Sequence, residues 1–122
     1  MILVDTSVWI DHLRKGSDTL IEILERDEVM THPFVIGELA CGNLKDRHEV
    51  LGLLAALPSA NVASDDEVLL FIEQHRLMGK GIGYVDAHLL ASATLTGETW
   101  FWTGDKRLRA VAATLRLAFE NS

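Results

Sequence analysis

The chain contains few of the residues that cross-link, stiffen or anchor a protein. Its 122 residues include one cysteine and two prolines. A single cysteine, Cys41, excludes an internal disulfide and a cysteine-based metal cluster, and it favours a reducing compartment. The opening apolar run at residues 2–4 is far shorter than a membrane span and lacks a basic flank. We therefore expect neither a signal peptide nor a membrane protein, and we expect a cytoplasmic location.

Positive charge is also scarce. The sequence has 11 lysines and arginines against 18 aspartates and glutamates, for a net charge of -7. Proteins that hold nucleic acid by long-range attraction usually present a basic face, so nucleic-acid chemistry in this chain would need bound cations. The acidity also agrees with simple solubility and does not select a function by itself.

The remaining composition is that of an ordinary globular domain. Hydrophobic residues make up 48% of the chain and charged residues 24%. A chain of this length can bury one core without disulfides or structural metals, but it has no room for a second. We predict a single domain over residues 1–122.

Short apolar runs alternate with segments of helical periodicity. The predicted strands are residues 1–4, 29–31, 61–63 and 99–102, with residues 116–119 as an optional edge strand. The predicted helices are residues 8–15, 18–26, 33–41, 47–57, 65–78, 84–95 and 106–113. This alternation predicts an α/β fold of three layers, in which helices flank a short, mostly parallel sheet. Ligands of such sheets bind at the carboxyl ends of the strands.

Two acids follow predicted strands. Asp5 comes directly after the first strand, and Asp105 comes shortly after the strand that ends at Trp102. Both should therefore lie at the same edge of the sheet. Either residue alone is better explained as a helix N-cap, because aspartate is a favoured residue there and stabilises the positive end of a helix.

Two other acids are predicted on inward helix faces. Asp86 shares a face with the apolar residues three, four and seven positions later, and Glu38 lies one turn after Phe34. Acids that face solvent rarely occupy such faces. A buried acid that pairs with an arginine or with a helix N-terminal amide explains each position as well as a functional role does.

The four acids together suggest a chemistry. If they converge in a partly buried site, each gains proton affinity, and divalent cations would have to supply the missing positive charge. Ligands that are all oxygen indicate Mg²⁺ or Mn²⁺. Such a site can hydrolyse a phosphodiester without a serine, cysteine or histidine nucleophile. The spacing alone does not establish that the four acids converge.

Four segments resemble the motifs of PIN-domain toxins of the VapC type. Residues 3–10 read LVDTSVWI, residues 32–39 HPFVIGEL, residues 83–93 GYVDAHLLASA and residues 102–108 WTGDKRL. The order and separation of these segments also match, and the resemblance extends over essentially the whole chain.

The resemblance implies a PIN fold and a magnesium-dependent endoribonuclease. Its site would be lined by Asp5, Glu38, Asp86 and Asp105. It places metal ligation most firmly on Asp5 and Asp86, with Asp105 as a supporting ligand and Glu38 as a ligand through water or a general base. Ser7 and Thr103 would position the acids or water. Family members act as the toxin of a type II toxin–antitoxin pair, usually homodimerise, and are silenced by a small antitoxin of the VapB type.

Other features carry less weight. The five histidines show no metal-ligand spacing, and we interpret them as structural or surface residues. The glycine-rich residues 79–83 lack the serine or threonine of a phosphate-binding loop. Core packing or a dimer face explains Trp100 and Trp102 better than base stacking does. Four basic residues could contact RNA phosphates or only balance nearby acids, namely Lys80, Lys106, Arg107 and Arg109.

Three alternative functions remain. A PIN-type RNA-processing nuclease that is not a toxin would carry the same site. A magnesium-binding phospho-acceptor domain would typically have two adjacent acids after the first strand and a lysine at the same edge, whereas Asp5 stands alone there. A non-catalytic binding module would be expected if some of the acids were missing. The RNA target is open within the nuclease interpretation.

Overall fold

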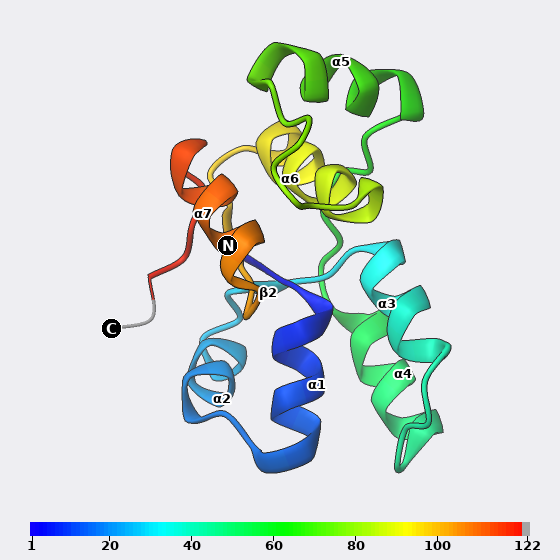
Figure 1. Ribbon diagram of the computed structural model, residues 1–122. Helices are drawn as coiled ribbons and strands as arrows, with labels where there is room; N and C mark the ends of the chain where they lie inside the picture. The colour runs from blue at the N-terminus through cyan, green and yellow to red at the C-terminus, as the bar shows by residue number, and fades with distance from the viewer. Residues whose placement is uncertain (121–122) are drawn as a thin grey trace.

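The computed structural model, which describes residues 1–120, has a small parallel sheet between helices (Figure 1). The strands are β1 (Ile2–Val4), β2 (Val29–Met30) and β3 (Trp100–Trp102). The helices are α1 (Thr6–Lys15), α2 (Asp18–Glu25), α3 (Pro33–Ala40), α4 (Arg47–Ala56), α5 (Asp65–His75), α6 (Tyr84–Thr96) and α7 (Lys106–Thr114). The predicted α/β class with a parallel sheet is confirmed.

The central strand of the sheet is β1. The strand order is β2-β1-β3, and both neighbours run parallel to β1, with Leu3 opposite Met30 on one side and Phe101 on the other. Figure 1 shows α5 and α6 on one side of the molecule and α1 to α4 on the other. Leu3, Leu89, Leu90 and Phe101 are all at most 1% exposed, so the core lies where α6 packs against the sheet.

The predicted strand at residues 61–63 is wrong. Its backbone N–H groups bond to helix side chains instead, since Asn61 donates to the Thr96 hydroxyl (2.9 Å) and Ala63 to the Ser92 hydroxyl (3.2 Å). Sheet-like pairing falls slightly earlier in the chain, as an isolated bridge between Thr31 and Ser59. Hydroxyls on α6 have therefore replaced the neighbouring strand that the apolar pattern suggested.

The optional edge strand at residues 116–119 is reduced to one bridge. Phe101 pairs with Ala118, where the Phe101 N–H donates to Leu117 O (2.6 Å) and the Phe119 N–H to Phe101 O (2.9 Å). The predicted helix at residues 65–78 ends at His75 because Arg76 adopts a left-handed conformation (φ 52°). Other boundaries differ from the prediction by one or two residues.

The two tryptophans of β3 differ in exposure. Trp102 is 9% exposed and packs against the Phe119 ring, with 5.3 Å between ring centroids, whereas Trp100 is 51% exposed. Core packing thus accounts for Trp102. None of the helices in residues 1–120 has the length and apolar character needed to cross a membrane.

Candidate active site

Asp5 lies at the carboxyl end of the central strand and is the most closely held of the four acids. It is 6% exposed. Its Oδ1 accepts the Thr6 N–H (2.8 Å), and its Oδ2 accepts the Ser7 hydroxyl (2.9 Å) and the Thr103 hydroxyl (2.7 Å). Asp5 is also the N-cap of α1, so the helix end and neutral donors stabilise its charge.

Thr103 joins the end of β3 to the end of β1. Besides donating to Asp5, its hydroxyl accepts the Asp105 N–H (3.1 Å). The Ser7 hydroxyl reaches the same loop, where it accepts the Gly104 N–H (2.9 Å). Ser7 and Thr103 therefore fix the carboxylate of Asp5 relative to the loop that carries Asp105, across more than ninety residues of sequence.

Asp105 is exposed and caps α7. Its Oδ1 accepts the Leu108 N–H at 3.0 Å. The capping interpretation therefore holds for Asp105 as it does for Asp5. Capping leaves the second oxygen of Asp105 available, because the described residues place no hydrogen bond on it.

Glu38 does not point inward, contrary to the expectation from the sequence. The buried residues of α3 are Val35 and Leu39, so the inward face is turned by about one residue from the face that contains Phe34 and Glu38. The exposed Glu38 side chain instead extends towards α1, where its Oε1 accepts a hydrogen bond from the Thr6 hydroxyl (2.7 Å). Thr6 contacts both Asp5 and Glu38, a role that the sequence analysis missed although Thr6 lies within the first motif.

Asp86 is half-buried in the first turn of α6, above the buried residues Leu89, Leu90 and Ala93. Its Oδ2 accepts the Gly83 N–H at 3.0 Å. Burial raises the pKa of Asp86, and the charges of Asp5, Asp105 and Glu38 raise it further, although the Gly83 hydrogen bond acts in the opposite direction. The other three acids are therefore close enough to Asp86 to repel its charge.

Within residues 1–120, no lysine or arginine forms an ion pair with any of the four acids. The same part of the chain has no group of three or more acidic, histidine or cysteine side chains placed to hold a metal ion as they stand. The donor set, however, consists of carboxylates and hydroxyls that carry unbalanced negative charge, which suits a hard divalent cation whose coordination is completed by water. The residues present therefore fit Mg²⁺ or Mn²⁺ in chemistry.

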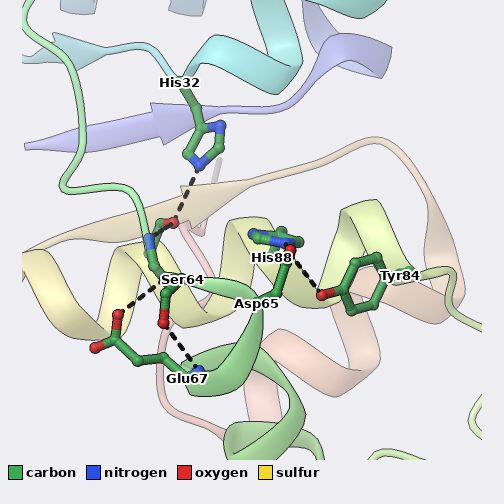
Figure 2. A network of polar contacts seen from close by, with 8 residues as sticks. His32, Ser64, Asp65, Glu67, Tyr84 and His88 are labelled. Atoms are coloured by element: carbon green, nitrogen blue, oxygen red, sulfur yellow. Dashed lines mark hydrogen bonds and ion pairs between the residues drawn. The ribbon is translucent and has the colours of Figure 1, made fainter.

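A second polar cluster, the histidine network, is built on α6 and its neighbours and consists of His32, Ser92, His88, Asp65 and Tyr84 (Figure 2). The His32 Nδ1 accepts the Phe34 N–H (3.0 Å), and its Nε2 lies 3.0 Å from the Ser92 hydroxyl. Asp65 accepts the Tyr84 hydroxyl (3.0 Å) and contacts the His88 Nε2 (3.1 Å). Burial, followed by the charge of His88, lowers the pKa of His32 to about 4.

Comparisons with known proteins agree with this architecture. The sequence model of the PIN domain family matches residues 2–114. Ribonuclease VapC32 from two strains of Mycobacterium tuberculosis, CDC 1551 / Oshkosh and H37Rv, is 53% identical over 113 residues, which cover 93% of this chain and 91% of that protein. A chain in the structure of FitAB bound to an IR36 DNA fragment matches with a TM-score of 0.61, covering 93% of this chain and 91% of that chain. The match to the FitAB chain is only 21% identical and shows the fold alone.

Proposed function

Because the chain belongs to the PIN domain family and is a relative of the VapC ribonucleases, we propose that it is an endoribonuclease that hydrolyses RNA phosphodiesters with Mg²⁺ or Mn²⁺. The observation that carries this proposal is a chain of hydrogen bonds, two between side chains and two from backbone N–H groups, that links three acids. Thr6 joins Glu38 to Asp5, and Thr103 joins Asp5 to Asp105. Asp86 completes the acidic site, defined here as Asp5, Glu38, Asp86 and Asp105.

The residues in and around the acidic site would have different roles in the reaction. Asp5, Asp86 and Asp105 would hold the cation, which supplies positive charge for the phosphate and lowers the pKa of a water molecule. Glu38 is exposed and accepts only a threonine hydroxyl within residues 1–120, so it is the acid best suited to take a proton from water. Ser7 and Thr103 keep the Asp5 carboxylate in one orientation.

Purified protein should cut RNA in the presence of Mg²⁺ or Mn²⁺ and stop when the metal is chelated. Asp5→Asn should remove the activity, because it neutralises the central acid while keeping its size. The matched control is Asp11→Asn, the same change at an exposed acid on α1 for which the described residues provide no hydrogen bond. Equal cleavage by both variants would contradict the proposal.

Metal binding gives an independent measurement. Titration calorimetry of the wild type should show saturable heat with Mn²⁺, and Asp5→Asn should weaken the binding while Asp11→Asn should not. A phospho-acceptor domain would also bind the metal but would not cut RNA, and a non-catalytic binding module would give no saturable heat. The two assays together therefore separate the nuclease from both alternatives.

The biological role that we propose is the toxin of a type II toxin–antitoxin pair, acting in the cytoplasm as a homodimer and silenced by a VapB-type antitoxin. The support is the 53% identity to Ribonuclease VapC32. Expression should arrest growth, and a small protein encoded by a neighbouring reading frame should relieve the arrest. A nuclease that processes RNA without acting as a toxin would cut RNA without arresting growth. Light scattering on the purified protein tests the dimer.

A further inference from the structure

A pocket of about 460 Å³ gathers positive charge on this acidic chain. It lies between the end of α5, the glycine-rich segment that follows it, and α7. Its charged or titratable lining residues are His75, Arg76, Lys80 and Arg107, and it has no acidic lining residue. The other lining residues are Leu77, Ala110, Val111 and Thr114. We call this feature the basic pocket.

The cations of the basic pocket have no acidic partner in the described part of the chain. Arg76, Lys80 and Arg107 take part in no ion pair there, whereas Arg26 pairs with Glu22 and Arg109 with Glu120. The chain has 18 acidic side chains, and none of them in the described residues neutralises this cluster, so the cluster keeps a local positive charge that attracts anions. The basic pocket therefore points to an anionic ligand.

A glycine brings one of these cations close to the backbone. A Cβ atom on Gly81 would lie 2.8 Å from the Arg107 Cδ and 3.1 Å from its Nη1, and Gly81 also has a positive φ of 81°. The Arg107 side chain thus lies against the glycine-rich segment. Two residues later the same segment provides Gly83, whose N–H donates to Asp86. Arg107 itself stands in the first turn of α7, which Asp105 caps.

The basic pocket and the acidic site are consequently built on the same two segments. Lys80 precedes Asp86 in one segment, and Arg107 follows Asp105 in the other. We propose that the basic pocket binds backbone phosphates of single-stranded RNA next to the phosphodiester that is cut in the acidic site. This inference rests on the proposed nuclease function. RNA is favoured over an acidic protein because a polymer held in the acidic site has its neighbouring phosphates nearby, and these repeat along the strand.

The test compares two double variants that remove the same charge. Lys80→Gln/Arg107→Gln removes two cations of the basic pocket, and Lys15→Gln/Arg26→Gln removes two exposed cations at the ends of α1 and α2. Binding of a single-stranded RNA is followed by fluorescence anisotropy over a range of salt concentrations, with the metal chelated so that the RNA is not cut. Circular dichroism checks that both variants fold.

We expect the Kd of the pocket variant to rise about tenfold at moderate salt and that of the control to change less than about twofold. Each lost phosphate contact lowers the slope of log K against log salt by about 0.7 for single strands, so two lost contacts lower it by about 1.4. Equal affinities and equal slopes in the two variants would overturn the inference. So would unchanged RNA binding with loss of affinity for poly-glutamate, which would assign the pocket to an acidic protein.

Cleavage assays separate this inference from the proposed function. If the wild type cuts RNA in an Asp5-dependent manner while the pocket variant binds RNA like the control, only the basic pocket has been misassigned. If the wild type neither cuts nor binds RNA, both proposals fail.

A pair of glycine variants tests the placement of Arg107. Gly81 and Gly79 both have positive φ, 81° and 71°, but only a Cβ on Gly81 would meet Arg107, since Gly79 has nothing within 4 Å. Gly81→Ala and Gly79→Ala should therefore strain the backbone alike, and only Gly81→Ala should displace the guanidinium. We expect Gly81→Ala to weaken RNA binding severalfold more than Gly79→Ala. Equal losses would contradict a role for Arg107 in holding the strand.

Discussion

Helix α6 contributes residues to two polar clusters that differ in how their charges and hydrogen-bonding groups are balanced. Its first turn supplies Asp86 to the acidic site, and its buried length supplies His88 and Ser92 to the histidine network. In the acidic site, burial raises the pKa of Asp86, and the like charges of the other three acids raise it further. In the histidine network, donors meet acceptors, except that the buried His88 Nδ1 has no hydrogen-bond partner in the described residues. Satisfied polar groups stabilise a fold, whereas unbalanced charge is typical of a functional site.

The protonation state of His32 follows from its contacts. The Phe34 N–H donates to Nδ1, so Nδ1 cannot carry the proton, and Nε2 must donate to the Ser92 hydroxyl. His32 is therefore neutral, and its side chain is 0% exposed. A second proton would place a charge in the core and break the Phe34 hydrogen bond. This is why the histidine network can be broken by acid.

The largest expected effect is the response of His32 to pH. The His32 pKa of about 4 lies below the usual 6.5. Between pH 4 and pH 6.5, His32 is therefore protonated in the unfolded chain and neutral in the folded chain. The stability that depends on neutral His32 is complete above pH 6.5 and is lost as the pH falls towards 4. At about 1.4 kcal/mol per unit, the loss is about 3 kcal/mol.

Urea unfolding of the wild type and His32→Asn at pH 7 and at pH 4 measures this loss. The asparagine can still cap α3 but does not titrate, so its variant should show a smaller decrease. The control is His48→Asn at an exposed position of α4, which should retain the pH response of the wild type. A His32→Asn variant with the same pH response as the wild type would disprove this assignment.

The second prediction concerns the hydrogen bond that orients the central acid. Thr103→Val keeps the shape of the side chain but removes the donor to Asp5 and the acceptor for the Asp105 N–H. Loss of such a supporting contact typically lowers activity 10- to 100-fold, so we expect kcat for RNA cleavage to fall by about that factor. Thr94→Val is the control, because the Thr94 hydroxyl donates within α6, to Leu90 O, and lies in no contact with the four acids among the described residues. Full activity in Thr103→Val would show that Asp5 does not need this contact.

The third prediction tests whether the acidic site destabilises the fold. Asp86→Asn keeps an acceptor for the Gly83 N–H and removes the charge that the other acids repel. We expect cleavage to be lost while the free energy of unfolding at pH 7 rises by about 1 kcal/mol, as is common when a functional charge is removed.

Because the pKa of Asp86 is raised, the destabilisation is present at high pH and disappears as the pH falls and Asp86 becomes protonated. The two proteins should therefore converge in stability near pH 3, and a variant less stable than the wild type at pH 7 would refute the repulsion.

The smallest effect is expected at the exposed end of the histidine network. Hydrogen bonds from His88 and, to a lesser degree, from Tyr84 lower the pKa of Asp65. Tyr84→Phe removes one of these donors, so the pKa of Asp65 should rise part of the way to its usual value. Carboxyl NMR titration measures this change. An unaltered Asp65 pKa would assign the whole perturbation to His88.

The helix caps and the order of the elements were predictable because they depend on neighbours in the sequence. Asp5 and Asp105 cap α1 and α7, as their positions before the predicted helices indicated. The strand predicted at residues 61–63 failed because hydroxyls about thirty residues away satisfy its N–H groups. The inward face predicted for Glu38 failed because α3 packs on Val35 and Leu39, and half-buried Phe34 gave no reliable sign of that face.

The sequence by itself determined the α/β class, the helix to which each acid belongs, and the family resemblance. Only the tertiary structure decided which distant groups share one site. Residues 5 and 103 meet because β1 and β3 are parallel neighbours, and Glu38 reaches the site through Thr6 because α3 packs against α1. Local preferences act over a few residues, whereas the proximity of distant side chains depends on how the sheet and helices pack around the core.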